Sequence, residues 1–413
     1  MTAASYTEIT KCRVCGKTTL IPVLSLGEQA LTGVFPKTKG EQVSKGNLDL
    51  VWCSACGLLQ MKQSYNLSEM YGMNYGYRSG LNQSMVNHLA SKARYLERLT
   101  FLTERNLVVD IGSNDGTLLN SYETKCIKVG IDPTAAKFRQ YYNKDVDVIP
   151  EFFPSKTFDN DYADIKAKII TSIAMFYDLE DPTAFVRAIE QRLADDGIWH
   201  FEQSYMPSML RMNAYDAVCH EHLEFYSYDV LEKILRQCNL RVVDIQMNAV
   251  NGGSIAITAC KKSAPYQTNI PISMWLRGQE SNMHLNTPTP YRQFEERVYR
   301  HRKDLYDLVN SLVNNGDLVL GYGASTKGNV LLQFCGLTER EIPCIADVNP
   351  DKFGCYTPGT GIPIVSEKEA REMHPDYFLV FPWHFKNSIL EREKEFTERG
   401  GRFIFPLPEI EIV

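Results

Sequence analysis

Short apolar runs alternate with amphipathic stretches through the middle of the chain, which predicts β-strands alternating with α-helices. The expected strands lie at residues 107–111, 127–131, 146–149, 167–172, 197–202, 240–246 and 254–259. The expected helices lie near residues 115–122, 134–142, 181–195 and 228–238. Strands separated by helices run parallel, whereas the tight turn Asn251-Gly252-Gly253 makes the last two strands antiparallel. The pattern therefore predicts a doubly wound domain with a mixed seven-stranded sheet.

The chain on either side of this block has a different pattern. Residues 1–70 contain short strands broken by glycine and proline, and residues 261–290 are polar and contain proline, which indicates a linker. A helical pattern at 291–314 then leads into a second strand–loop–helix unit that begins at Asp317. We therefore expect an α/β protein of three domains, the last of them Rossmann-like, with boundaries at 1–70, 71–285 and 286–413.

The strand at 107–111 ends in a loop in which glycine and asparagine alternate, and this loop is the most informative motif of the chain. Such a loop lets a ligand approach the backbone closely and offers it backbone N–H groups. Asp132 ends the next strand, where a carboxylate can accept both hydroxyls of a ribose. The residues expected at this cofactor site are Asp110, Gly112, Asn114, Asp115, Gly116 and Asp132.

The details of the loop indicate which nucleoside cofactor it binds. In a dinucleotide fingerprint the middle residue is glycine, but this chain has Asn114, and the third glycine is missing. Asparagine tolerates a positive φ, so the turn is kept, whereas close approach of a pyrophosphate is hindered. The pattern Asp110-x-Gly112-x-Asn114-x-Gly116 is similar to the S-adenosylmethionine loop of doubly wound methyltransferases. The sequence therefore favours a methyl-donor site over an ordinary βα turn.

Two Cys-x-x-Cys-Gly motifs, Cys12 with Cys15 and Cys53 with Cys56, stand in the first block. Each motif points two thiolates at one position, and two motifs together complete the four-sulfur shell that zinc prefers. The ion would be structural, because such a shell leaves no open coordination position. The alternative is a redox pair or a chance pattern, and the remaining cysteines are expected to be small buried hydrophobes.

The composition limits the partners and the location of the protein. Its net charge of −6 argues against a nucleic-acid-binding surface, although a local basic pocket could still bind phosphates. No apolar run reaches the length of a membrane span, and the first residues lack the basic-then-apolar pattern of a signal peptide. Cysteines in metal-binding pairs favour a reducing compartment, so we expect a cytoplasmic protein, either a monomer or a dimer.

A second constellation, His220-Glu221-His222, follows the fifth strand of the central block. Ligands of open α/β sheets lie outside the carboxyl ends of the strands, so this position suits a catalytic role. One interpretation is a His-x-His metal site, which needs a third ligand that the sequence does not identify. A second is a pair of packed structural histidines. The third is a general base whose tautomer and basicity are set by an adjacent carboxylate.

Two aromatic segments lie close to the expected site in the sequence. Residues 71–79 place tyrosines between glycines, which indicates a loop that covers the active site or a packed connector between domains. This segment carries Tyr75, Tyr77, Arg78 and Ser79. Phe152 and Phe153 follow the third strand, where they flank an adenine or belong to the core.

The last block carries half of a dinucleotide site after the strand at 318–320. Gly321 and Gly323 follow this strand, but Thr326 takes the place of the third glycine. The side chains of Ser325, Thr326 and Lys327, with backbone N–H groups, suit the diphosphate of a nucleotide sugar. An NAD site and a purely structural domain are the alternatives.

Taken together, these motifs resemble the C-methyltransferases that act on carbon 3 of nucleotide-linked 4-keto deoxysugars. The resemblance covers essentially the whole chain. It rests on the two cysteine motifs, residues 75–79 and 110–118, Glu202 with Tyr205, and residues 220–223, 251–254, 321–328 and 356–364.

This resemblance implies zinc in the first domain, S-adenosylmethionine in the second, and a third domain that helps to hold a sugar nucleotide of the dTDP or GDP type. It implies that His222 is the catalytic base, with Glu221 and either Tyr75 or Tyr77 nearby. The substrate contacts expected with it are Arg78, Ser79, Glu202, Tyr205, His220, Ser325, Thr326 and Lys327.

The chain departs from this family at one position and leaves other functions open. Where the family often has a tyrosine directly before His-Glu-His, this chain has Cys219, so any role of that hydroxyl is absent or moved to Tyr215 or Tyr226. An O- or N-methyltransferase would keep the cofactor loop without needing a carbon acid. Two less favoured alternatives are an NAD-dependent oxidoreductase that uses residues 321–328 and a non-catalytic zinc module.

Overall fold

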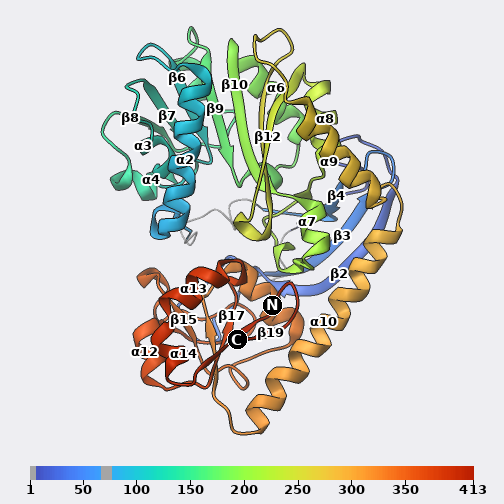
Figure 1. Cartoon of the computed structure of the whole chain (residues 1–413), viewed down its shortest axis with the longest axis vertical. Helices are drawn as coiled ribbons and strands as arrows, with labels where there is room; N and C mark the ends of the chain where they lie inside the picture. The colour runs from blue at the N-terminus through green and yellow to red at the C-terminus, as the bar shows by residue number, and fades with distance from the viewer. Residues whose placement is uncertain (1–5, 67–76) are drawn as a thin grey trace.

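Three large β-sheets organise the chain, and the computed structural model describes residues 6–66 and 77–413 of it. Figure 1 shows the seven-stranded sheet of the central domain in the upper lobe and the six-stranded sheet of the C-terminal domain in the lower lobe. The four-stranded sheet of the N-terminal domain lies along one side, where the two lobes meet.

The central sheet has the order β12-β13-β10-β9-β6-β7-β8. Its parallel strands are β6 (Leu107–Ile111), β7 (Ile127–Ile131), β8 (Val146–Ile149), β9 (Ala167–Ile173) and β10 (Leu193–Ser204). Strand β13 (Ser254–Lys261) runs antiparallel to both β10 and β12 (Leu240–Asn248). All seven predicted strands are present, and the predicted mixed sheet is confirmed.

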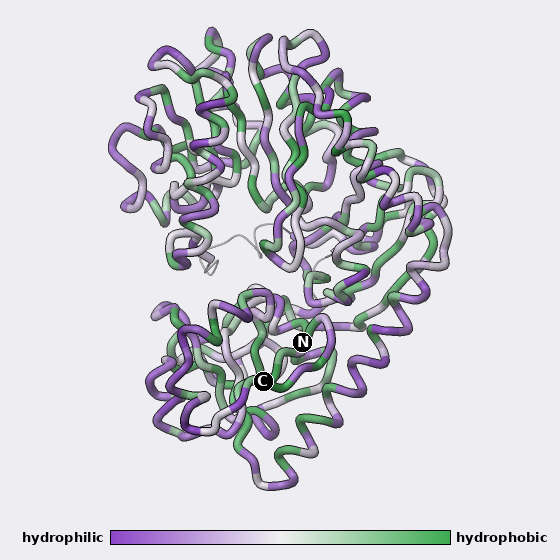
Figure 2. Tube along the Cα trace, viewed as in Figure 1, coloured by the Kyte–Doolittle hydropathy of each residue, from purple (hydrophilic) through white to green (hydrophobic). Residues whose placement is uncertain are grey.

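Helices cover both faces of this sheet, as expected for a doubly wound domain. They are α2 (Gln83–Thr100), α3 (Thr117–Asn120), α4 (Ala135–Phe138), α5 (Lys156–Asp161), α6 (Pro182–Arg192) and α8 (Tyr228–Gln237). Figure 2 shows the hydrophobic positions following the strands, while the outer turns are hydrophilic. The alternation of strands and helices in the sequence therefore predicts a sheet between two layers of helices, because the strands of a parallel sheet are buried on both faces.

The predicted linker at 261–290 is wrong in its central part, where the chain forms α9 (Ile270–Asn282). This helix packs on α8 and β12 and buries Leu276 and Glu280. The sequence pattern hid it because Pro271 and Gly278 are poor helix formers, although proline is tolerated in the first turn of a helix.

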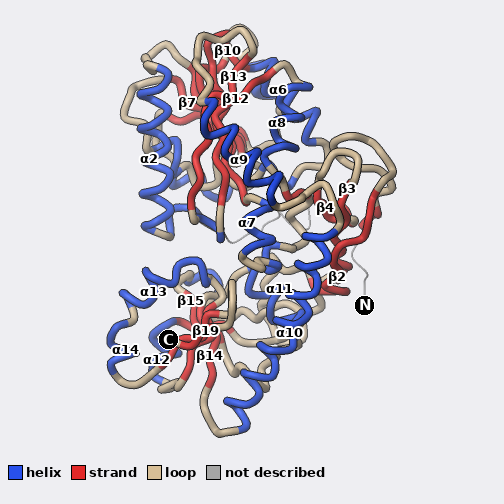
Figure 3. The backbone as a smooth tube through the Cα atoms, turned by 45° about the vertical axis from the view of Figure 1, so that its right-hand side comes forward, coloured by secondary structure: helices blue, strands red, loops and turns tan. Residues whose placement is uncertain are grey.

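The C-terminal sheet has the order β16-β15-β14-β17-β18-β19. Its strands are β14 (Val319–Tyr322), β15 (Ile345–Asp347), β16 (Ile364–Ser366), β17 (Tyr377–Val380), β18 (Arg402–Phe405) and β19 (Glu411–Ile412). The first five are parallel, and their order reverses between β14 and β17, as in a Rossmann-like domain, which confirms the prediction. Its helices are α10 (Thr289–Asn314), α11 (Thr326–Cys335), α12 (Glu367–Glu372), α13 (Lys386–Arg392) and α14 (Lys394–Glu398). The long helix α10 runs along the outside of the molecule from the upper to the lower lobe (Figure 3).

The N-terminal sheet contains a strand from the middle of the chain. Its strands are β2 (Leu20–Ala30), β3 (Lys45–Cys53), β4 (Leu59–Met61) and β11 (Glu224–Phe225), and β1 (Tyr6–Glu8) pairs separately with β5 (Gln63–Tyr65). Strand β11 pairs antiparallel with β4, so the chain leaves the central sheet after β10 and α7 (Met206–Arg211) and joins the N-terminal sheet. The His-Glu-His segment lies on this excursion.

The apolar side chains of this excursion share their core with the other two domains. Met209, Tyr215, Val218 and Leu223 belong to the same buried cluster as β2, β3 and the C-terminal sheet. The central sheet has a separate cluster beneath α6 and α8. Across residues 6–66 and 77–413, no helix has the length and apolar content needed to cross a bilayer.

Candidate active site

Four cysteines of the N-terminal domain converge on one point. The sulfur atoms of Cys12 and Cys56 are 3.5 Å apart, as are those of Cys15 and Cys53, and all four lie within 4.8 Å of one another. Zinc–sulfur bonds of about 2.3 Å in a tetrahedron put the sulfurs about 3.8 Å apart, so the four thiolates fit zinc. The predicted four-cysteine site is therefore present, and zinc would be a structural ion there.

The zinc site is packed against the central domain. Cys12, Cys53 and Cys56 belong to the buried cluster beneath the central sheet. The Lys233 ammonium on α8 donates a hydrogen bond to the Cys56 carbonyl at 3.3 Å. A metal site in this place stabilises the contact between the two domains as well as the N-terminal sheet.

The predicted cofactor loop connects β6 to α3 with three residues in the left-handed region. Gly112, Asn114 and Gly116 have φ angles of 73°, 51° and 77°. A Cβ on Gly116 would lie 2.5 Å from the Tyr142 ring, and one on Gly112 would lie 3.0 Å from Met175, so the loop needs glycine at both positions. The N–H groups of all three residues already donate to protein oxygens, so the loop offers a ligand fewer free donors than the sequence analysis expects.

Two carboxylates lie at the strand ends that border the loop. Asp132 Oδ1 accepts both the N–H and the hydroxyl of Thr134 at 2.6 Å, and Oδ2 accepts the Asn114 N–H at 2.8 Å. Because a carboxylate oxygen has two lone pairs, Oδ2 can still accept one ribose hydroxyl. Asp110 accepts the Thr171 hydroxyl at 2.6 Å. Burial raises the pKa of Asp110 to about 7, against the lowering effect of that hydrogen bond.

The segment just before α2 lies across the cofactor loop. The Asn114 amide accepts the Ser79 N–H at 3.0 Å and donates to the Tyr77 carbonyl at 3.1 Å. Asp115 accepts the Gly80 N–H at 2.9 Å and lies 3.5 Å from the Arg78 guanidinium. Arg78 and Ser79, which were expected to contact substrate, therefore lie against the cofactor loop in this structure.

The remaining aromatic candidates are divided between exposed and packed positions. Tyr77 and Phe152 are about half exposed, at 51% and 49%. Phe153 packs edge-on against Phe185, with ring centroids 5.3 Å apart. Tyr75 lies outside the described residues.

His222 lies in the excursion after α7, and its orientation is defined. Its Nδ1 lies 2.8 Å from the Ala217 carbonyl, so Nδ1 carries the proton, and Nε2 is an acceptor with no hydrogen-bond partner among the described residues. Tyr177 packs edge-on against the imidazole at 4.4 Å, and it stands two residues after Met175, whose side chain lies against Gly112. Burial, with the charge of Lys327, lowers the pKa of His222 to about 4, so the ring is neutral near pH 7.

Glu221 lies where the three domains meet. A Cβ on Gly33 of the N-terminal domain would lie 2.1 Å from Glu221 Oε1 and 3.7 Å from the hydroxyl of Thr326 in the C-terminal domain. Glu221 is 8% exposed, and its Oε2 has no hydrogen-bond partner within the described part of the chain. Burial raises the pKa of this carboxyl, which favours its protonated form.

Three residues expected to contact substrate have structural partners instead. His220 is 1% exposed and its Nδ1 lies 3.2 Å from the Thr32 hydroxyl, so it packs into the N-terminal domain and faces away from His222. Glu202 pairs with His88 at 2.7 Å and Lys92 at 3.0 Å, and Tyr205 donates to Glu280 at 2.7 Å. The side chains of Glu202 and Tyr205 are engaged, whereas the buried Nε2 of His220 has no hydrogen-bond partner within the described part of the chain. Substrate contact by these three residues stays a prediction.

The loop after β14 faces the central domain. Ser325 caps α11, because its hydroxyl accepts the Gly328 N–H at 3.0 Å. The Lys327 ammonium reaches the central domain and donates to the Asn251 carbonyl at 3.1 Å. Ser325, Thr326 and Lys327, the predicted phosphate-binding residues, therefore lie at the boundary between the lobes. Lys327 is close enough to His222 for its positive charge to lower the pKa of that histidine.

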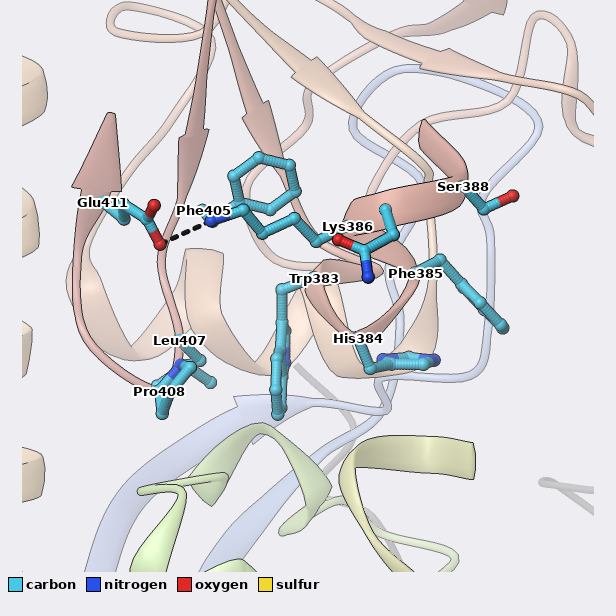
Figure 4. Close-up of a pocket in the computed structure, with 10 residues that line it drawn as sticks. Trp383, His384, Phe385, Lys386, Ser388, Phe405, Leu407, Pro408 and Glu411 are labelled. Carbon is cyan, nitrogen blue, oxygen red and sulfur yellow. Dashed lines mark ion pairs between the residues drawn. The ribbon is translucent and has the colours of Figure 1, made fainter. Parts of the chain in front are cut away.

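Sequence analysis missed a second loop of the C-terminal domain at this boundary. Trp383 and His384 follow β17 in the short helix η7 (Trp383–Phe385), and they line a cavity of about 430 Å³ (Figure 4). The Trp383 indole N–H donates to Asp216 of the central domain at 2.8 Å. The signal that could have found them is their position after a strand of a doubly wound sheet, which is the rule applied above to residues 220–222.

These features define the class of the protein. A mixed seven-stranded sheet with this loop and Asp132, joined to a four-cysteine zinc site, is an S-adenosylmethionine-binding methyltransferase fold. Three family models match successive parts of the chain, namely a zinc binding domain at residues 12–71, a methyltransferase domain at 86–245 and a C-methyltransferase C-terminal domain at 249–408.

A full-length relative identifies the family. The chain is 31% identical over 412 residues to the C-methyltransferase NovU of Streptomyces niveus, covering 98% of this chain and 97% of the relative. The chain therefore belongs to the C-methyltransferase family, and it is an S-adenosylmethionine-dependent C-methyltransferase.

Solved structures of methyltransferases match less than half of the chain. A chain in the complex of the Haloferax volcanii Trm112 methyltransferase activator with a methyltransferase is 16% identical, covers 44% of this chain and 93% of its own length, and gives a TM-score of 0.37. The magnesium protoporphyrin IX methyltransferase of Synechocystis is 13% identical, covers 43% and 79%, and gives a TM-score of 0.32.

Proposed function

We propose that this C-methyltransferase adds a methyl group to carbon 3 of a nucleotide-linked 4-keto-6-deoxyhexose, with His222 as the general base. The observation that carries the proposal is the state of His222. Its ring is neutral, its Nε2 has no hydrogen-bond partner in the part of the chain that the structure describes, and it lies between the cofactor loop and the C-terminal domain. A keto group at carbon 4 acidifies the hydrogen on carbon 3, which is the proton such a base removes.

The residues around His222 suit the two stages of this reaction. His222 Nε2 takes the carbon 3 proton, and the resulting enolate oxygen needs a hydrogen-bond donor. Glu221 is a candidate donor because its raised pKa favours the protonated carboxyl, and Tyr77 is another because it is half exposed beside the cofactor loop. S-adenosylmethionine supplies the electrophilic methyl group when bound, and the protein holds the two reactants in line.

Lys327 links binding of the nucleotide to the strength of the base. A lone imidazole with a pKa of about 4 is a weak base, and the positive charge of Lys327 is part of the cause. A diphosphate bound by Lys327, Thr326 and the N-terminus of α11 would neutralise that charge and raise the His222 pKa. The base would then become stronger when the sugar nucleotide is in place.

The acceptor is tested with labelled methyl donor and a panel of dTDP- and GDP-linked 4-keto-6-deoxyhexoses. We expect one of them to gain a methyl group on carbon 3, located by NMR. A methyl group on oxygen or nitrogen would refute the proposed chemistry, and no transfer to any member of the panel would refute the substrate class.

The base is tested with His222→Asn, which we expect to lower turnover by about 10²–10⁴-fold while S-adenosylmethionine still binds. His284→Asn is the matched control, because His284 is exposed and its φ of 52° suits asparagine. Exchange of the carbon 3 hydrogen with deuterated solvent in the presence of S-adenosylhomocysteine isolates the proton-removal step. Near-normal turnover and exchange in His222→Asn would exclude this role.

A further inference from the structure

The hydrogen-bond partner of His222 lies on a short turn that the C-terminal domain holds. This turn, η4 (Tyr215–Ala217), follows α7 in the sequence. Its last residue, Ala217, accepts the His222 Nδ1–H at 2.8 Å. The orientation of the imidazole therefore depends on where η4 is placed.

Two buried hydrogen bonds connect η4 to the C-terminal domain. Asp216 Oδ2 accepts the Trp383 indole N–H at 2.8 Å, and the Tyr215 hydroxyl lies 2.9 Å from His301 Nδ1 on α10. His301 Nε2 lies against the Pro406 carbonyl and so carries the proton, which makes Nδ1 the acceptor for Tyr215. Figure 4 shows the Trp383 ring extending from its loop toward the ribbon of the central domain.

The packing around η4 also connects this turn to the C-terminal domain. Tyr215 and Asp216 are fully buried, and Tyr215 packs edge-on against Phe334 of α11 at 5.4 Å. Ala214, Tyr215 and Ala217 belong to the apolar cluster that the N-terminal and C-terminal domains share, whereas the central sheet has its own cluster. The turn thus follows the central sheet in the chain but is packed outside it, and Trp383, His301 and Phe334 of the C-terminal domain contact it directly.

We infer that the C-terminal domain sets the orientation and tautomer of His222 through η4, which makes Tyr215, Asp216 and Trp383 positioning residues for methyl transfer. The inference rests on the proposed role of His222 as the base. It assigns the C-terminal domain a second task besides holding the nucleotide. A shift of this domain relative to the central sheet moves the Ala217 carbonyl, so domain docking and preparation of the base are one event.

The test uses the full-length, zinc-loaded protein and two variants that each remove one connecting hydrogen bond. Trp383→Phe keeps an aromatic ring but loses the N–H donor, and Tyr215→Phe loses only the hydroxyl. Tyr299→Phe is the matched control, because its hydroxyl links α10 to the Ser25 carbonyl at 2.9 Å without touching η4. Zinc content and far-ultraviolet circular dichroism verify that all three fold.

The first readout is the tautomer of His222, measured by NMR on ¹⁵N-histidine-labelled protein and assigned with His222→Asn. We expect a single Nδ1–H tautomer in the parent protein and in Tyr299→Phe, and mixed tautomers in Trp383→Phe and Tyr215→Phe. The second readout is turnover, which we expect to fall about ten- to a hundredfold in these two variants, with the KM for S-adenosylmethionine unchanged.

Two results separate this inference from the proposed function. If Trp383→Phe and Tyr215→Phe keep the parent tautomer and turnover while His222→Asn is inactive, the positioning inference fails and the base role stands. If His222→Asn turns over normally, the base role fails, and the tautomer measurement alone then decides whether the C-terminal domain orients this ring.

Discussion

At the scale of single residues, burial decides which of the candidate side chains are able to react. His220 and His222 are two positions apart, yet one is enclosed by the N-terminal domain and the other lies between the lobes. Glu221 and Glu202 are both buried carboxyls, but Glu202 is paired with His88 and Lys92 whereas Glu221 has an unpartnered oxygen in the described part of the chain. Although burial opposes ionisation, those partners hold the pKa of Glu202 at about 2, which suits a structural ion cluster rather than an acid–base group.

The lowered pKa of His222 predicts the acid side of the pH profile. Because the folded protein holds this pKa at about 4, we expect kcat/KM to fall near pH 4 rather than near the ordinary histidine value of about 6.5. Lys327→Met should raise the pKa of His222 in the free protein, since one positive charge is removed. NMR titration of the imidazole measures both values, and an unchanged pKa in Lys327→Met would contradict the assigned cause.

The same shift has a consequence for stability. The unfolded chain binds a proton at this histidine near pH 6.5, whereas the folded protein does not bind it until about pH 4. His222 therefore lowers the free energy of unfolding as the pH falls from about 6.5 to about 4, and contributes no further change below that.

At the scale of elements, the site is assembled from the ends of strands and the loops that follow them. The loops after β6, β9, β14 and β17 all contribute to it, and they come from two sheets. Two glycines, Gly33 and Gly112, leave room for Glu221 and Met175 at these junctions. Small residues at such positions let backbone and side chains of different domains approach closely.

Gly33 provides a test of this close approach. Gly33→Ala would put a methyl group 2.1 Å from Glu221 Oε1, so the carboxyl must move. We expect a loss of turnover and a decrease in the free energy of unfolding of up to about 1–3 kcal/mol. Enzyme assays and urea unfolding measure the two effects.

Gly278→Ala is the control for this substitution, because no atom lies within 4 Å of the added methyl group and the residue is exposed on α9. It should raise the free energy of unfolding by about 0.5–1 kcal/mol through helix propensity. Full activity in Gly33→Ala would show that Glu221 does not need its present position.

At the scale of the whole molecule, the three domains share cores, so they cannot be separated cleanly. Strand β11 completes the N-terminal sheet, the zinc cysteines pack beneath the central sheet, and η4 is buried in the cluster that the N-terminal and C-terminal domains share. The candidate active site is formed where these segments of one domain pack into another. Each domain therefore depends on another for part of its buried surface.

This sharing predicts that losing zinc destabilises more than the N-terminal domain. Cys56→Ser removes one ligand, and we expect loss of the ion and a decrease of more than about 4 kcal/mol in the stability of the chain. Cys126→Ser is the control, because Cys126 is also buried but belongs to the separate cluster around α2 and α3. Zinc content and thermal unfolding measure the outcome. A Cys56→Ser protein that keeps its zinc and unfolds like the control would contradict the prediction.

Local signals were sufficient for most of the fold. The seven strands of the central sheet, the tight turn at Asn251-Gly252-Gly253 and the two cysteine motifs follow from apolar periodicity and residue spacing, because each depends on neighbours in the chain. Helix α9 was missed because its stability comes from packing on α8 and β12 rather than from its own propensity.

The sequence by itself determined the seven strands of the central sheet, the methyl-donor loop, the metal ligands and the candidacy of His222 as a base. Only the tertiary structure decided that His220, Glu202 and Tyr205 are engaged elsewhere and that Trp383 and Asp216 join the two lobes. The reason is physical. Backbone pattern and turn chemistry are local, whereas burial, pKa and hydrogen-bond partners depend on residues that are far apart in the chain and meet only in the folded protein.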